Sequence, residues 1–149
     1  PNDIMSCDKK IGGILIENFF KKGKLKASII GVGLNLNKGS FDNLPYATSL
    51  EEVSHKIWSQ KQLLNIIMPN LYNVLYKTDF QNIDNLLFIY NEQLWKKNQR
   101  VICKSSKTEF MASLKGVSTK GRLIIETDEK KVMEKSTNEI RIDYNSIGC

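Results

Sequence analysis

A lysine followed by paired glycines and an apolar run is the first feature of this sequence that can carry chemistry. Lys10 precedes Ile11-Gly12-Gly13, and residues 14–16 are all aliphatic. A lysine offers a compact positive charge to an anionic ligand, and glycines remove side chains where a ligand must approach the backbone. A surface lysine beside a glycine bulge gives the same pattern, so these residues alone leave both interpretations open.

Small polar residues lie on either side of this segment. Asn2 and Asp3 precede it, and Asn35 and Asn37 alternate with leucines after Gly31-Val32-Gly33. Alternation at the end of a strand places both amides on one face. An asparagine amide can read the edge of a purine, and it can equally cap a turn. A dinucleotide-binding loop is excluded, because a third glycine and an immediate helix are missing.

Two apolar segments must position these residues. Residues 11–17 and 25–36 predict two strands. Between them, residues 18–24 contain Lys21-Lys22-Gly23-Lys24, a polar glycine turn suited to a hairpin. Residues 38–47 are rich in turn formers and predict a loop. Thr48 then stands three residues before Glu51, which predicts a capping box at the start of a helix.

Apolar spacing of three and four predicts two further helices. The first runs from Ser59 to Leu75 with a kink or break at Pro69, and the second from Ile83 to Trp95. Their apolar faces comprise Leu63, Leu64, Ile67, Leu71, Val74 and Leu75 in the first, and Ile83, Leu86, Leu87, Tyr90 and Leu94 in the second. Helices covering a sheet indicate an α/β or α+β layer.

Helical spacing is lost after residue 96. Short strands are predicted instead, over residues 101–104, 109–117, 122–127, 131–134 and 139–142. Short strands with frequent turns are typical of a small barrel. The sequence therefore predicts two domains, residues 1–95 and residues 96–149.

Bulk properties exclude several classes. The chain has 149 residues, 41% of them hydrophobic and 26% charged, as expected for a globular protein with a core. No apolar run approaches the ~20 residues that span a bilayer, and no signal-peptide pattern is present, so we predict a cytoplasmic protein.

Cys7, Cys103 and Cys149 lack disulfide or metal-ligand spacing. The net charge is +6, but the lysines are dispersed, which disfavours nucleic acid as the main partner. His55, the only histidine, is given no role.

Three segments together resemble the biotin–protein ligases: residues 1–3, residues 10–17 and residues 29–37. In that family a Trp-Pro-Asn-Asp turn precedes a Lys-x-x-Gly-Ile-Leu strand, and a Gly-x-Gly-x-Asn-x-Asn strand end follows. Ala47-Thr48-Ser49-Leu50 is similar to a further family segment, and residues 116–125 resemble its SH3-like terminal domain. The resemblance implies the second half of a class II-synthetase-like catalytic domain over residues 1–95, followed by an SH3-like barrel.

The resemblance also implies a ligase that joins biotin to ATP as biotinyl-5′-AMP. The biotinyl group then passes to a lysine of a biotin carboxyl carrier protein domain. The resemblance implies that Lys10 is catalytic and that Lys10, Gly13 and Leu15 bind biotin. It implies that the adenylate is bound by Asn2, Asp3, Asn35, Ala47 and Thr48, with Asp3 reaching Mg²⁺ through phosphate. Glu139 is implied to lie near the ligand and the acceptor. Lys9 is set aside because it alternates to the opposite side of an extended segment.

The sequence departs from the family in three respects. The glycine- and arginine-rich biotin loop and a DNA-binding winged helix have no counterpart in these residues, and the chain starts at Pro1 inside the resembled motif. We therefore expect a fragment that is inactive alone. Homodimerisation, with Phe19 and Phe20 as contacts, is left open. The alternatives are a lipoate–protein ligase and a non-enzymatic SH3-like module that binds protein or RNA.

Overall fold

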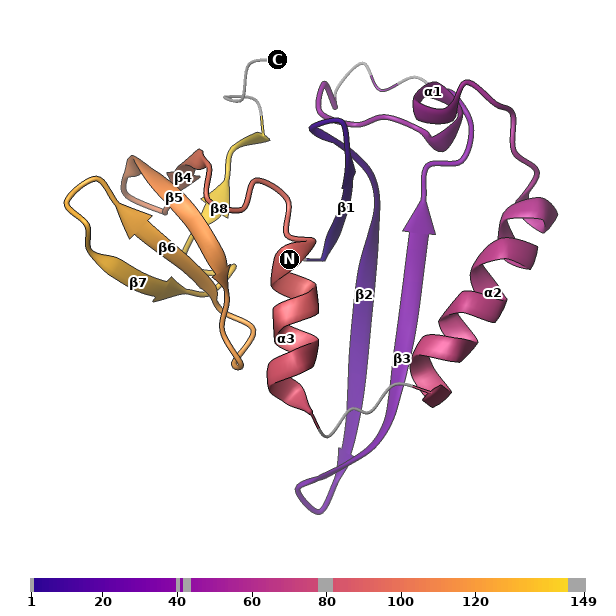
Figure 1. The fold of residues 1–149 in the computed structure, drawn as a ribbon, viewed down its shortest axis with the longest axis horizontal. Coiled ribbons are helices and arrows are strands. Elements are labelled where there is room, and N and C mark those ends of the chain that lie inside the picture. The colour runs from indigo at the N-terminus through magenta and orange to yellow at the C-terminus, as the bar shows by residue number, and fades with distance from the viewer. Residues whose placement is uncertain (1, 40, 42–43, 78–81, 145–149) are drawn as a thin grey trace. The chain divides into compact units, whose positions relative to one another are not determined.

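The computed structural model of the chain, shown in Figure 1, describes residues 2–39, 41, 44–77 and 82–144. The chain divides into two compact units, which we call the ribbon unit (residues 2–72) and the sheet unit (from Asn73 onward). Each unit combines antiparallel strands with helix, so the predicted mixed α/β class is confirmed. The proposed domain boundary after Trp95 stays a prediction, and the second compact unit begins earlier.

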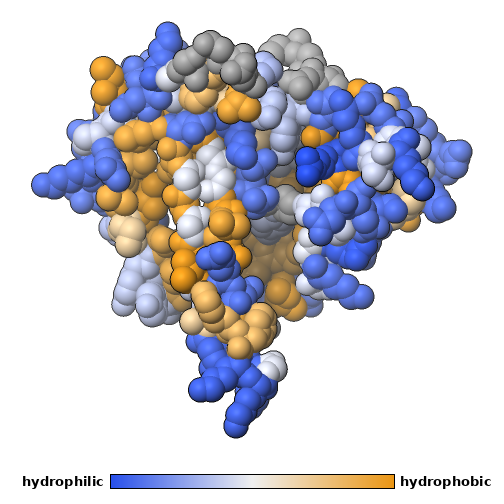
Figure 2. Space-filling model, turned by 180° about the vertical axis from the view of Figure 1, so that it is seen from behind, coloured by the Kyte–Doolittle hydropathy of each residue, from blue (hydrophilic) through white to orange (hydrophobic). Residues whose placement is uncertain are grey.

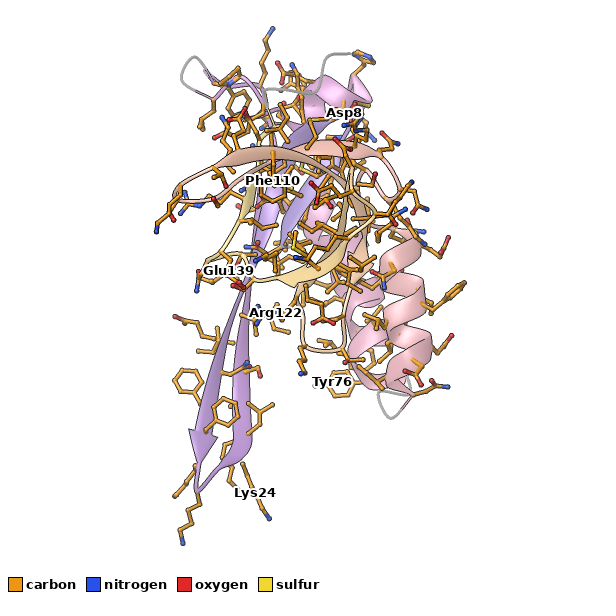
Figure 3. The ribbon with its side chains drawn as sticks, turned by 90° about the vertical axis from the view of Figure 1, so that its left-hand side faces the viewer. Asp8, Lys24, Tyr76, Phe110, Arg122 and Glu139 are labelled. Carbon is orange, nitrogen blue, oxygen red and sulfur yellow. The ribbon has the colours of Figure 1, made fainter. Side chains whose placement is uncertain are left out.

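The ribbon unit is built on a long antiparallel hairpin. Its strands are β1 (Asp3–Ser6), β2 (Lys9–Lys21) and β3 (Lys24–Leu34), in the order β1-β2-β3. Lys22 and Gly23 form the turn between β2 and β3 with φ of 50° and 73°, and two positive φ values suit the right-handed twist of a tight hairpin. Lys24 therefore lies at the tip of the ribbon (Figure 3).

The ribbon is longer than the sequence predicted. The predicted glycine turn at Lys21-Lys22-Gly23-Lys24 is confirmed, but β2 runs past its predicted end at Glu17, through Phe19 and Phe20 to Lys21. Both phenylalanines pair with residues of β3, as Phe19 with Ala27 and Phe20 with Leu25. The turn needs only two residues with positive φ, so glycine at position 23 beside a lysine suffices.

Two helices complete the ribbon unit and its junction with the sheet unit, α1 (Leu50–Ser54) and α2 (Gln60–Lys77). The predicted capping box is off by one residue: Ser49 is the N-cap and Glu52 closes the box. The reason is that the amide of Thr48 is already bonded to the carbonyl of Lys10. Pro69 lies inside α2, which continues past it as one helix.

The apolar faces of the helices are only partly covered. In α2, Leu63, Ile67 and Leu71 are half-buried at a spacing of four, whereas Leu64, Val74 and Leu75 are exposed. Helix α3 (Ile83–Glu92) ends three residues before the predicted Trp95, at the C-cap Gln93. Leu86, Leu87 and Leu94 are half-buried, but Ile83 and Tyr90 are exposed, so the buried face predicted for this helix was too wide.

The sheet unit contains five antiparallel strands in the order β7-β6-β5-β4-β8. These are β4 (Arg100–Lys104), β5 (Glu109–Val117), β6 (Leu123–Thr127), β7 (Val132–Lys135) and β8 (Arg141–Ile142). Four predicted strands are confirmed within one residue. The fifth is shorter than predicted, because Glu139 and Ile140 donate their amides to the Ser136 carbonyl and form a turn. Among the described residues the ladder does not close, so a barrel is not confirmed.

The buried apolar core lies in the sheet unit. Each of its members exposes less than a tenth of its surface to solvent. They are Val101, Cys103, Ala112, Leu114, Val117, Leu123, Ile125 and Ile140. They alternate along β4, β5 and β6, as expected for a sheet with one covered face. None of the described helices is long and apolar enough to cross a membrane. Pro1 of the resembled motif, Ser40, Asp42 and Asn43 of the predicted loop, and Cys149 lie outside the described residues.

Candidate functional site

A β-bulge in the ribbon unit determines where Lys10 points. Ile4 pairs with Gly12 but Met5 pairs with Lys10, so Ile11 is an extra residue in β2. A bulge of this kind interrupts the alternation of side chains and redirects those before it. Lys10 consequently shares a face with Gly13 rather than opposing it, and its Cε lies 3.8 Å from the position that a Cβ on Gly13 would take.

The ammonium group of Lys10 is held by a carboxylate. Its Nζ lies 2.6 Å from Oδ1 of Asp3, with both side chains partly exposed. Asp3 is directly opposite Gly13 in the β1–β2 ladder. Asn2 extends that ladder, since the Ile14 amide donates to its carbonyl at 2.8 Å and its Nδ2 donates to the Ile14 carbonyl at 3.2 Å. The position of the Lys10 ammonium group is thus set by Asp3 of β1.

An open hollow of about 440 Å³ lies over this face of the ribbon. Its lining includes the polar trio Asn2, Asp3 and Lys10, together with Gly13, Ile14, Leu15, Gly31, Val32 and Gly33. It therefore contains five of the predicted site residues, including both predicted biotin contacts besides Lys10.

Three glycines form the floor of the hollow. Gly13 pairs with Gly33, and Gly31 pairs with Leu15. A Cβ on Gly33 would meet nothing within 4 Å, and one on Gly31 would meet only the Leu15 carbonyl at 3.7 Å. The glycines thus leave space that side chains would otherwise fill, as a flat ligand over the backbone requires. Sequence reasoning missed Gly31 and Gly33, although their alternate spacing places both on one strand face.

Asn35, Ala47 and Thr48 come together beside the backbone of Lys10. The Lys10 amide donates to the Tyr46 carbonyl at 2.7 Å, and the Thr48 amide donates to the Lys10 carbonyl at 2.9 Å. Nδ2 of Asn35 donates to the Thr48 carbonyl at 3.0 Å. This hydrogen bond joins two segments rather than capping a local turn, and it engages one N–H of the side-chain amide. The role of Asn35 stays a prediction. These three residues do not line the hollow itself.

Glu139 belongs to the sheet unit and is engaged there. Its carboxylate lies 2.5 Å from Arg122 and 3.7 Å from Lys135, and it accepts a hydrogen bond from the Ser136 amide at 2.8 Å. Figure 3 labels Arg122 and Glu139, whose side chains approach each other. The bond from the Ser136 backbone, assisted by the Ser136 side chain and the two cations, lowers the pKa of Glu139. Its proximity to a ligand stays a prediction.

The only histidine and two of the cysteines were given no role by the sequence. His55 is exposed and ends α1 in a left-handed conformation with φ of 54°. Cys7 is exposed and Cys103 buried, and both are free thiols. Across the described residues, no cluster of three or more histidine, cysteine, aspartate or glutamate side chains is arranged to hold a metal ion.

Comparisons with known proteins agree with this geometry. A relative from Salmonella typhimurium, the bifunctional ligase/repressor BirA, is 25% identical over 140 residues, which cover 86% of this chain and 41% of the relative. The crystal structure of biotin protein ligase from Aquifex aeolicus matches with a TM-score of 0.72 at 26% identity, over 96% of this chain and 62% of that chain. The resemblance to the biotin–protein ligases is confirmed.

A second structure of the Aquifex aeolicus biotin protein ligase, in complex with biotin and ATP, matches with a TM-score of 0.66 over 96% of this chain and 60% of that chain. No protein-family model matches the sequence. The chain spans about two fifths of the length of the curated biotin ligase relative that it matches. Its similarity to the biotin–protein ligases therefore concerns one part of their architecture.

Proposed function

We propose that this chain forms part of a biotin–protein ligase, which activates biotin with ATP as biotinyl-5′-AMP and transfers it to a lysine of a biotin carboxyl carrier protein domain. The observation that carries the proposal is the ion pair of Lys10 and Asp3 above a floor of glycines. It occurs in a chain of which 96% matches a biotin protein ligase of known structure.

Lys10 is the catalytic residue of this proposal. The first step joins two anions, the carboxylate of biotin and the triphosphate of ATP, and releases pyrophosphate. A lysine fixed between them reduces their repulsion and stabilises the charge that develops at the α-phosphate. Asp3 holds the ammonium group within the hollow before the substrates arrive. Gly13 gives biotin access to the backbone, and Leu15 packs on its apolar part.

Asp3 also fits a supporting role toward Mg²⁺. Magnesium in nucleotide sites is held by one or two carboxylates together with the substrate phosphates, and Asp3 offers one carboxylate at the edge of the hollow. When bound, the ion would neutralise phosphate charge. Asn2 would lie by the adenylate, and Asn35, bordered by Ala47 and Thr48, would recognise adenine with the amide atoms that its bond to Thr48 leaves available.

The remaining parts of the proposal concern the sheet unit and the partners. The antiparallel sheet of β4 to β8 corresponds to an SH3-like domain, in which Glu139 would lie near the ligand and the acceptor. The carrier domain is the macromolecular substrate, the cytoplasm is the expected location, and a homodimer is compatible with the exposed Phe19 and Phe20. A repressor activity, which the name of the Salmonella relative includes, is not proposed.

Biotin-dependent exchange between ATP and radiolabelled pyrophosphate tests the proposal. The chain is assayed alone, where we expect no exchange, and with the portion of the Aquifex aeolicus ligase that has no counterpart in it. In the complemented protein, Lys10→Ala should reduce exchange by about 10²-fold or more, since a charge at the reacting centre is lost. Lys9→Ala is the matched control and should retain activity. Equal rates for both variants would contradict the proposal.

A substrate competition separates biotin from lipoate. Radiolabelled biotin and lipoate are offered to the complemented protein together with ATP, and the adenylates are separated. We expect biotinyl-5′-AMP to form. Formation of lipoyl-AMP instead would assign the chain to the lipoate–protein ligases.

A further inference from the structure

Residues 46–50, which we call the strap, connect the two halves of the proposed adenylate site. The strap is bonded to β2 through the paired backbones of Lys10, Tyr46 and Thr48. It is bonded to the end of β3 through Asn35, whose carbonyl accepts from the Leu50 amide at 2.8 Å and whose Nδ2 donates to Thr48. The Asn35 amide also donates to the Ile11 carbonyl of β2 at 2.8 Å, so the strap sets the orientation of the Asn35 side-chain amide rather than the distance between the backbones of Asn35 and Lys10.

One carboxylate holds the strap in place. Oε2 of Glu52 accepts from Oγ1 of Thr48 at 2.8 Å and from the Ser49 amide at 3.3 Å, while the Glu52 amide donates to Oγ of Ser49 at 3.2 Å. Thr48 and Ser49 are buried, at 5% and 0% exposure. The hydrogen bond from Thr48, with the Ser49 amide and the charges of Lys38 and Lys9, lowers the pKa of Glu52. Glu52 is thus an ionised acceptor at neutral pH.

We infer that Glu52 is a positioning residue of the proposed adenylation site: by fixing Thr48 it sets the orientation of the Asn35 side-chain amide. This inference rests on the proposed function. Glu52 needs no contact with a substrate, because its effect passes through the strap. Without its carboxylate, the buried Thr48 hydroxyl loses its acceptor, and the backbone pairing of Thr48 with Lys10 loosens.

The neighbouring Glu51 provides a matched control. It lies in the same turn of α1 and carries the same charge, but its Oε2 accepts from the amide of Lys38 at 2.8 Å and not from the strap. Removing Glu51 therefore changes the net charge and helix composition as Glu52→Ala does, while leaving the bonds to Thr48 and Ser49 intact.

The experiment uses the 149-residue chain with Glu52→Ala, Glu52→Gln and Glu51→Ala, and measures hydrogen exchange of the Thr48 amide and binding of ATP with Mg²⁺ by NMR. In Glu52→Ala we expect Thr48 exchange to accelerate roughly ten-fold and ATP affinity to fall roughly five-fold, the scale of one lost hydrogen bond to a charged group. Exchange in the β2–β3 ladder should be unchanged. Glu52→Gln keeps an acceptor and should restore both properties, and Glu51→Ala should match the parent chain.

Equal Thr48 exchange in Glu52→Ala and Glu51→Ala would overturn the inference, as would an equal loss of ATP affinity in both. Failure of the parent chain to bind ATP would overturn the inference. The proposed function fails by a different result, equal pyrophosphate exchange of Lys10→Ala and Lys9→Ala in the complemented protein. If Glu52→Ala does not fold, Thr48→Val removes the same hydrogen bond from the other partner. Unchanged ATP affinity in Thr48→Val would then overturn the inference.

Discussion

The ribbon unit and the sheet unit use apolar residues in opposite ways. Each described apolar side chain that is buried belongs to the sheet unit, between Val101 and Ile140. On the ribbon, by contrast, large apolar side chains are 41–66% exposed, namely Leu15, Ile16, Phe19, Phe20, Leu25, Ile29, Ile30 and Val32. Figure 2 shows this apolar band above the hydrophilic tip of the ribbon.

The difference shows that the two units are stabilised by different interactions. The sheet unit is stabilised by removing apolar surface from water. The ribbon is held by its backbone ladder and by the strap, whose buried residues are the polar Thr48 and Ser49. Exposed apolar surface on this scale is typical of a face that contacts something else. The unit that carries the candidate site is therefore the one with less of its own core.

The largest effect should come from truncating the same residue type in each unit. Ile125→Ala removes a fully buried side chain and should lower the free energy of unfolding by about 2–5 kcal/mol. Ile16→Ala removes a side chain that is 54% exposed and should change it by less than about 0.5 kcal/mol. Urea titration followed by NMR signals of each unit measures the two free energies of unfolding. A comparable loss for Ile16 would mean that the ribbon has a core of its own.

Substitutions of two glycines on neighbouring strands, Gly12 of β2 and Gly33 of β3, test whether the floor of the hollow is open. A Cβ on Gly12 would lie 2.4 Å from the Gly33 carbonyl oxygen, so Gly12→Ala should distort the ladder and cost about 1–3 kcal/mol. A Cβ on Gly33 meets nothing within 4 Å, so Gly33→Ala should leave stability nearly unchanged and instead weaken ligand binding. Thermal unfolding and titration with biotin and ATP distinguish the two. Equal destabilisation would show that the space above Gly33 is not open.

Local pattern was enough to predict most of the strands. Alternating apolar residues bounded by turn formers gave β4 to β7 within one residue, because each strand covers one face of a compact core. The length of β2 was missed because Phe19, Phe20 and Lys21 continue a strand that no core requires. Whether the sheet closes depends on contacts between distant strands, which local periodicity does not contain.

Five of the predicted site residues line one hollow, but the geometry that brings them together was not predictable. Simple alternation separates Lys9 from Lys10, yet it would also place Lys10 opposite Gly13. The extra Ile11 puts them on one face, and a bulge depends on pairing with β1. The shift of the cap from Thr48 to Ser49 has the same origin, since a bond to Lys10 outweighs the local signal. Glu52 was missed because its partners are defined by that shift.

Substituting one asparagine in each unit compares what a side-chain hydrogen bond contributes to stability there. Asn91 of α3 accepts from the Val117 amide at 2.7 Å and donates to its carbonyl at 3.2 Å, both partly buried. Asn91→Ala should cost about 1–2 kcal/mol, because two backbone groups of β5 lose their partner. Asn18 accepts from Ser28 on the exposed ribbon, so Asn18→Ala should cost less than about 0.5 kcal/mol. Denaturant midpoints measure both, and equal costs would contradict the comparison.

The smallest effect should be the contribution of Glu139, in the sheet unit, to the dependence of stability on pH. The hydrogen bond from the Ser136 backbone, with Arg122 and Lys135, lowers the pKa of Glu139 in the folded chain. A lowered pKa stabilises the fold above the unfolded value of about 4.3 and loses that contribution as pH falls through the folded value. Glu139→Gln should therefore be slightly less stable than the parent chain at pH 7, and the gap should close as pH falls through the folded pKa of Glu139.

Glu17→Gln, on the exposed ribbon, is the control for this pH dependence and should follow the parent chain throughout. Thermal unfolding at a series of pH values records the differences. A constant gap for Glu139→Gln would mean that its carboxylate acts by shape rather than charge. A gap that widened at low pH would contradict the direction of its pKa shift. Because the Glu139 side chain is exposed, solvent screening keeps the difference small even where it is largest.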